Sequence, residues 1–138
     1  MIQSGRASFI VSSSETDPAA ISNLLGLSPT SVTNARRVTR HHIWSIDTGE
    51  IVNTSEDQTG THAVRTLLKL IQPALSKASN LPPDCEARIQ WSAYSDSVQG
   101  GFVMPADLAA AIGELGVDVY STVYLDDPDD SNGSGPPR

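Results

Sequence analysis

Apolar residues recur every three or four positions in a segment near the C-terminus, which is the spacing of one face of a helix. They are Leu108, Ile112 and Leu115. Pro105 suits the first helical position, because its missing N–H would have no helical partner there. Gly116 suits the end of the helix, since glycine adopts the left-handed backbone of a C-terminal cap without strain. The sequence therefore predicts a helix between these two residues.

The residues after this glycine alternate between apolar and polar, as in a strand with one buried side. The apolar positions are Val117, Val119, Val123 and Leu125, and Tyr120, Thr122 and Tyr124 lie between them. A helix and a strand that each have one apolar side must cover one another or a neighbour. We therefore expect this pair to belong to a single core.

The same two patterns recur in the rest of the chain. They predict strands over 6–13, 40–47 and 85–95, and helices over 17–25 and 61–79. Pro73 interrupts the longer helix, so that either the helix kinks there or a second short helix starts at Pro73. Because the apolar register continues beyond it, we expect a kink. The strand over 40–47 has no clear phase, which indicates either cover on both sides or a bulge.

The remaining segments are polar and rich in turn-forming residues. They cover 30–39, 48–59 and 97–101, and the last leads into a short strand over 101–103. Residues 127–138 are acidic and then rich in proline and glycine, so we expect a disordered tail after one folded domain over 1–126.

These elements predict a single α+β domain with a mainly antiparallel or mixed sheet of about five strands and helices on one face. Two helices open similarly, with Pro18-Ala19-Ala20-Ile21 and Pro105-Ala106-Asp107-Leu108, and each lies between two strands. Two strand–helix–strand units in one sheet would make a variant of the ferredoxin-like arrangement.

The charge of the chain bears on its partners. The formal net charge is −7 and the isoelectric point is about 4.7, which argues against nucleic-acid binding and suits a basic protein partner. Cys85 is the only cysteine, so no intramolecular disulfide can form. The chain has no apolar run that would span a membrane and no signal-peptide pattern at its start, so we expect a cytoplasmic protein.

No catalytic motif is recognised in the sequence. The serines at 12–14 are not in a glycine-flanked nucleophile elbow, and Asp84 and Glu86 should raise the pKa of Cys85. His41 and His42 are neighbours in a predicted strand and would point to opposite faces, so we predict no metal site and no cofactor.

One sheet face has the composition of an interface. If the apolar residues of the last two long strands face the helices, the opposite face carries Arg88, Gln90, Tyr94, Tyr120 and Tyr124. Tyrosine and arginine among small polar residues are typical of protein–protein contacts, whereas the negative charge argues against stacking RNA bases. A plain solvated face is the alternative, because tyrosine also favours strands by itself.

A second candidate site is the only basic cluster, formed by Arg36, Arg37 and Arg40. It could bind an anion with Trp44 as one wall, although a solvated loop explains the same residues.

Several short stretches carry a resemblance to a known family: Asp17-Pro18 to Ile21, Leu24 to Pro29, Trp44-Ser45-Ile46, Leu67-Leu68, and Leu115-Gly116 leading to Val119-Tyr120. In these residues and in the order of its elements, the chain resembles a bacterial family, domain of unknown function 4279. Where the family usually has a glycine-containing stretch, this chain has Arg36-Arg37. The resemblance implies the family's fold, over about Ala7 to Tyr124, and implies no activity or catalytic residues.

Two functional hypotheses follow. The first is a non-enzymatic binding module that self-associates or docks another protein through the tyrosine-bearing face, for example an acidic immunity-like or antitoxin-like protein with a basic partner. The alternative is a small-molecule-binding domain or enzyme that holds an anionic ligand near Arg36–Trp44.

Overall fold

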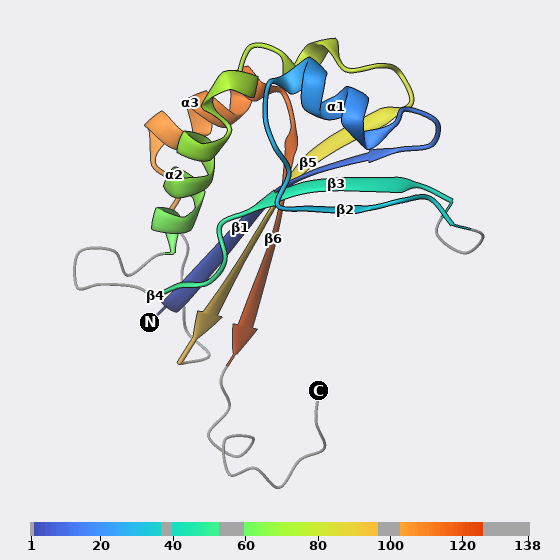
Figure 1. The fold of residues 1–138 in the computed structure, drawn as a ribbon. Helices are drawn as coiled ribbons and strands as arrows, with labels where there is room; N and C mark the ends of the chain where they lie inside the picture. The colour runs from blue at the N-terminus through green and yellow to red at the C-terminus, as the bar shows by residue number, and fades with distance from the viewer. Residues whose placement is uncertain (1, 37–39, 53–59, 97–102, 126–138) are drawn as a thin grey trace, which may run out of the picture.

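Helices cover one face of a mixed sheet in the computed structural model, which describes residues 2–36, 40–52, 60–96 and 103–125 (Figure 1). In chain order the elements are β1 (Ile2–Ser13), α1 (Pro18–Leu25), β2 (Ser31–Thr33), β3 (His42–Asp47), β4 (Ile51–Val52), α2 (Thr61–Leu70), β5 (Cys85–Ser95), α3 (Ala106–Leu115) and β6 (Asp118–Leu125). This α+β architecture confirms the predicted fold class. The predicted tail lies outside the described residues.

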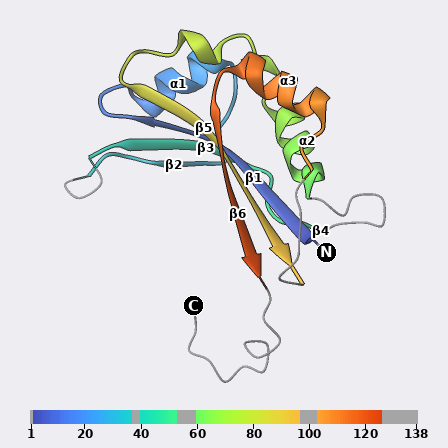
Figure 2. The ribbon, with the colours of Figure 1, turned by 180° about the vertical axis from the view of Figure 1, so that it is seen from behind.

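The sheet is organised around β1, which pairs with β3 on one side and β5 on the other, antiparallel in both cases. The strand order is β2-β3-β1-β5-β6, and β4 pairs with the beginning of β1. Strand β6 is parallel to β5, as the helical crossover through α3 requires. The two edges are β2 and β6 (Figure 2).

This topology is a variant of the ferredoxin-like arrangement. Helix α1 leads from β1 to β2, and these two strands are parallel because each is antiparallel to β3, which lies between them. Helix α2 leads from β3 to β5 in the same way, with β1 between them, and α3 then adds β6 parallel to β5 at the edge. The second unit of the arrangement is therefore built on α2, and the short similarity between the starts of α1 and α3 reflects the shared use of proline near a helix N-terminus.

The ends of α1 follow from its sequence. The side chain of Asp17 accepts the backbone N–H of Ala19 at 3.0 Å, which satisfies one donor of the first turn. Gly26 ends the helix at φ 70°, and its N–H donates to the carbonyl of Ser22. These local signals place both ends as predicted.

The predicted kink at Pro73 is wrong. Helix α2 ends at Leu70, and the chain continues as two short 3-10 turns, Gln72–Ala74 and Ala78–Asn80. Proline lacks the N–H that the α-helix needs and disfavours the α conformation of the residue before it. The apolar residues beyond α2 still face the sheet, because Ile71, Ala74 and Ala78 are buried.

Two segments predicted as loops contain short strands. Residues 31–33 form β2 beside β3, and residues 51–52 form β4 beside β1. Between β3 and β4 the chain bulges: Ser8 pairs with Asp47, but Gly5 pairs with Ile51. Arg6 and Ala7 of β1 therefore lie opposite three residues, 48–50. Gly49, the middle one, takes the left-handed conformation with φ 72°. Strands this short leave no alternation that a sequence pattern could reveal.

The phase of β3 is settled by burial. Trp44 and Ile46 are buried beneath the helices, whereas Ile43 lies on the other face of the sheet and is half-buried. Trp44 meets Phe9 edge to face, with ring centroids 6.1 Å apart, and its indole N–H donates to Ser22 at 2.9 Å. The helices therefore cover only one side of β3, and the bulge lies after this strand instead of within it.

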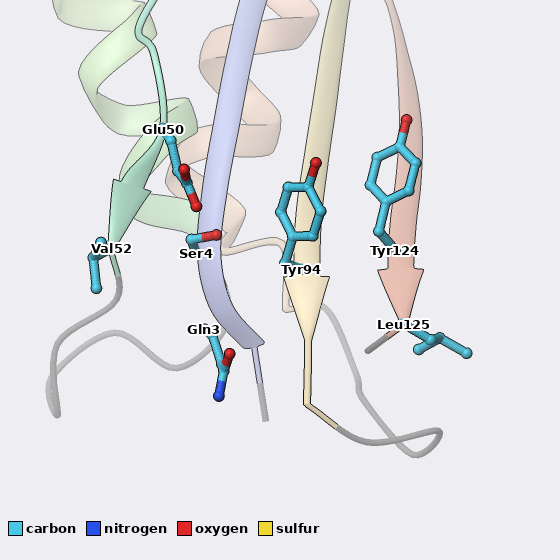
Figure 3. Close-up of a pocket in the computed structure, with 7 residues that line it drawn as sticks. All are labelled: Gln3, Ser4, Glu50, Val52, Tyr94, Tyr124 and Leu125. Atoms are coloured by element: carbon cyan, nitrogen blue, oxygen red, sulfur yellow. The ribbon is translucent and has the colours of Figure 1, made fainter. Parts of the chain in front are cut away.

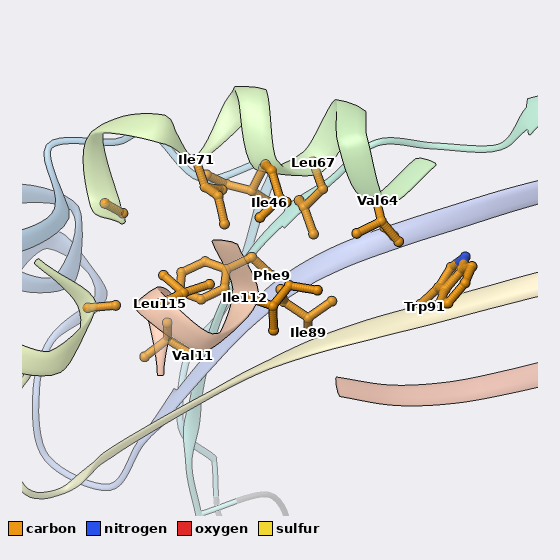
Figure 4. Packing of buried hydrophobic residues seen from close by; sticks show 14 of the residues in the cluster. Phe9, Val11, Ile46, Val64, Leu67, Ile71, Ile89, Trp91, Ile112 and Leu115 are labelled. Atoms are coloured by element: carbon orange, nitrogen blue, oxygen red, sulfur yellow. The ribbon is translucent and has the colours of Figure 1, made fainter. Parts of the chain in front are cut away.

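The core lies between the sheet and the helices. Figure 4 shows the side chains of Val64 and Leu67 of α2, and of Ile71 directly after it, directed towards the sheet, where Phe9 and Ile89 lie. Near one end of the core, Trp91 donates its indole N–H to the carbonyl of Gly60 at 3.1 Å. Both tryptophans therefore serve the covered side, and the functional residues must be sought elsewhere.

Candidate functional site

The face of the sheet opposite the helices is here called the open face. It carries the outward side chains of three neighbouring strands: Arg6, Ser8, Ile10 and Ser12 from β1, Arg88, Gln90, Ser92 and Tyr94 from β5, and Tyr120, Thr122 and Tyr124 from β6. The parallel register sets Gln90 beside Tyr120 and Tyr94 beside Tyr124. Five residues that the sequence assigned to one face are thus brought together on adjacent strands.

Each tyrosine of the open face is 49% exposed. The rings of Tyr94 and Tyr124 are close to parallel, 22° apart in orientation, with centroids separated by 5.0 Å. The guanidinium of Arg88 lies over the ring of Tyr120, 5.2 Å from its centroid. The face therefore holds ordered aromatic surface that remains in contact with water.

A groove of about 740 Å³ lies at one end of the open face, beside the two stacked rings (Figure 3). Its lining comes from four strands and the bulge: Gln3, Ser4, Glu50, Val52, Tyr94, Tyr124 and Leu125. Ser4 pairs with Tyr94 on one side and with Val52 on the other, so a small side chain stands between two larger ones. The hollow exists because β1 places serine at this position.

An ion pair crosses the open face next to this groove. The guanidinium of Arg6 donates to both carboxylate oxygens of Asp47, with Nε at 3.0 and 2.9 Å. These hydrogen bonds lower the pKa of Asp47 and raise the pKa of Arg6. The charge of Glu50 raises the pKa of Arg6 slightly further. Because Asp47 neutralises Arg6, Glu50 remains as the negative charge of the groove.

A smaller hollow of about 230 Å³ lies at the other end of the open face. It is lined by Ile10, Ser12, His41, Ile43, Glu86 and Arg88. His41 thus lies near β5, a proximity that the sequence did not reveal. The lining is mixed in charge and includes two isoleucines, so this hollow offers little that selects one ligand.

The second predicted site is only partly assembled. Arg36 and Arg40 are exposed, and the N–H of Arg40 donates to the carbonyl of Arg36 at 2.8 Å, which closes a turn. Arg37 lies outside the described residues. Trp44 is fully buried in the core, so its ring does not form a wall beside these arginines.

Cys85 has the surroundings of a structural thiol. Burial raises its pKa, and the carboxylate of Asp84 adds to the effect, which keeps the thiol protonated. Asp84 itself accepts three hydrogen bonds, from the hydroxyl and N–H of Thr16 and the N–H of Glu15, at 2.7 to 2.9 Å. These bonds lower the pKa of Asp84 to about 2. The hydrogen bonds from Glu15 and Thr16 to Asp84 therefore hold the loop after β1 against the start of β5.

Among the described residues, no group of three or more His, Cys, Asp or Glu side chains could hold a metal ion. Within the same residues, no helix is both long enough and apolar enough to cross a membrane.

Sequence reasoning missed most of the groove. Glu50 and Val52 fell in a predicted loop, and Leu125 was assigned to the covered side although it is 48% exposed. Val123, also expected to be buried, is 39% exposed, because β6 is an edge strand whose far end the helices do not cover. The groove residues are brought together by the pairing of β1 with β4 on one side and, on the other, by the pairing of β1 with β5 and of β5 with β6. No local pattern signals the short β4 pairing.

Comparison with known proteins gives one match. No curated protein and no solved structure matches the chain. A family model matches residues 3–126, which is nearly the whole described fold. The resemblance inferred from the sequence is confirmed, and the chain belongs to the family described as domain of unknown function (DUF4279).

Proposed function

We propose that this protein is a non-enzymatic, cytoplasmic binding module that docks a basic protein through the open face of its sheet. The observation that carries the proposal is the row of tyrosines on β5 and β6, each 49% exposed and each in contact with another side chain of the face. Tyrosine is enriched where proteins bind one another, because its large ring loses little conformational entropy on contact.

The charges of the face favour a basic partner. Its two arginines are already engaged, Arg6 by Asp47 and Arg88 by the ring of Tyr120. The carboxylates that border the face are Glu50, Glu86 and Asp118, and four aspartates follow β6 in the sequence. The whole chain carries −7, so its field attracts a cationic protein and speeds encounter with it.

Other occupants have less support. A second copy of this chain would bring two charges of −7 together, which opposes self-association. An anionic ligand near Arg36 and Arg40 would lack the indole wall that made this site attractive, because Trp44 lies in the core. A partner of immunity or antitoxin systems would fit the same charge argument.

The proposal is tested with an array of random short peptides probed by the labelled protein. We expect the bound peptides to be enriched in lysine and arginine. Tyr120→Arg should reduce binding at least tenfold, because it adds a positive charge to the row of tyrosines and removes the ring beneath Arg88. The matched control is Ala109→Arg, which adds the same charge to an exposed position of α3 on the covered side.

Two results would overturn the proposal. One is a bound set without enrichment in basic residues, or binding that falls equally in both variants. The other is a wild-type dimer by light scattering that becomes a monomer in Tyr120→Arg, because the open face would then belong to a second copy of the chain.

A further inference from the structure

We infer that the groove beside Tyr94 and Tyr124 is a cation site that receives the side chain of an arginine or lysine from the partner. The inference rests on the proposed function and names the chemical group recognised at one end of the open face.

The walls suit the stem of a long basic side chain. Val52 stands on one side, 74% exposed, and the rings of Tyr94 and Tyr124 stand on the other with Leu125 at the end (Figure 3). Lysine and arginine both carry an apolar stem that packs along such surface while the charged end stays in polar surroundings. Ser4, between the walls, leaves the space that the stem would occupy.

The charge of the groove selects a cation. Glu50 is exposed and lines the groove, while the nearby Arg6 is held by both oxygens of Asp47. The amide of Gln3 adds a polar group without a charge. An anion would be repelled by the carboxylate of Glu50, whereas a cation would be attracted to it.

The open face already holds one cation in this way. Arg88 places its guanidinium over Tyr120, which lies four residues before Tyr124 on β6. Attraction between a cation and the face of a tyrosine ring operates for an incoming side chain as it does for an internal one. The stacked pair offers two such rings next to a carboxylate, and both rings remain half exposed.

The experiment is an NMR titration of the isotopically labelled protein with Nα-acetyl-arginine amide. The comparison probe is Nα-acetyl-citrulline amide, which has nearly the same shape and no charge. We expect the arginine probe to shift the amide signals of Tyr94, Tyr124 and Val52 in a saturable way. The citrulline probe should bind at least tenfold more weakly, since it loses both the carboxylate and the cation–ring contacts.

Two variants locate the site. Glu50→Gln keeps the shape of the side chain and removes its charge, and should weaken the arginine probe about tenfold. Its control is Glu114→Gln, which removes an exposed carboxylate from α3 and should leave binding unchanged. A third variant, Ser4→Leu, fills the groove without touching a charge and should also block the probe.

The outcomes separate this inference from the proposed function. Equal binding of both probes, or equal effects of Glu50→Gln and Glu114→Gln, would overturn the cation site. If basic peptides nevertheless bind and Tyr120→Arg abolishes that binding, the proposed function stands and only the groove has been misassigned. If the arginine probe binds the groove but no peptide binds the face, the proposed function falls and the cation site stands as a small-ligand site.

Discussion

The two faces of the sheet are built by the same strands, yet they use their side chains in opposite ways. On β5 the covered face places Ile89 and Trp91 in the core, whereas the open face places Arg88 and Tyr94 in water. The polar atoms of the covered face are satisfied internally, as in the bond from Trp91 to Gly60. The aromatic surface of the open face is ordered by its neighbours but left half exposed. Substitutions on the covered face should therefore affect folding, and those on the open face should affect binding.

The largest expected effect is on the covered face, at Trp44. Replacement by alanine removes a fully buried indole, its edge-to-face contact with Phe9 and its hydrogen bond to Ser22. We expect Trp44→Ala to lower the free energy of unfolding by about 3 to 5 kcal/mol, measured by urea denaturation. Tyr120→Ala is the comparison on the open face and should cost less than about 1 kcal/mol. Equal losses would contradict the division between the faces.

The next effect concerns a glycine behind the covered face. Gly60 has φ 80°, and an added Cβ would lie 3.3 Å from Cγ2 of Ile2. Gly60→Ala should therefore cost about 1 to 2 kcal/mol from backbone strain, with a further loss from the close contact. The control is Gly49→Ala, where φ is 72° and the added Cβ meets nothing within 4 Å. The difference in melting temperature between the two variants measures the cost of the close contact, because both share the backbone strain. Equal melting temperatures would show that the residues around Gly60 move aside without cost.

A smaller effect is expected for the aromatic pair of the open face. A double-mutant cycle with Tyr94→Ala and Tyr124→Ala should give a coupling of about 0.5 to 1 kcal/mol, because the two rings stack but are half exposed. Urea denaturation of the four proteins measures this coupling. A coupling above about 2 kcal/mol would mean that the pair belongs to the folding core, and would remove the reason to regard it as a binding surface.

The smallest effect is expected for Asp84, which directly precedes β5. Its pKa of about 2 in the folded protein lies below its usual value of 3.8, so its hydrogen bonds stabilise the fold at pH values above the usual value. This contribution should disappear as the pH falls from about 4 to about 2. Asp84→Asn should therefore have a lower melting temperature than the wild type at neutral pH, and the difference should shrink in acid. A difference that is constant with pH would point to lost geometry instead of lost charge.

The open face shows how far sequence reasoning reaches. Alternation along β5 and β6 was enough to assign Arg88, Gln90, Tyr94, Tyr120 and Tyr124 to one face, since neighbours in a strand point to opposite sides. It was not enough to show that Val123 and Leu125 are exposed, because burial at an edge depends on where the helices end. The pattern of a strand defines its two faces but does not say how much of either is covered.

The sequence by itself determined the elements whose causes are local. Asp17 and Gly26 fix the ends of α1, Gly116 ends α3, and period-two alternation fixes β5. It also carried the family resemblance, which a family model confirms over residues 3–126. Each of these features depends on residues within a few positions of one another, so the chain carries the information directly.

Only the tertiary structure decided the features that depend on distant partners. Pro73 ends the α-helix locally, but the path of the chain beyond α2, which buries Ala74 and Ala78 in 3-10 turns, depends on packing against the rest of the core. Strands β2 and β4 form because β3 and β1 offer them an edge. The groove arises where the bulge brings Glu50 beside Ser4 and Tyr94, which come from three separate parts of the chain. Such a site is defined by strand pairing, and pairing depends on hydrogen bonds between segments that no local pattern connects.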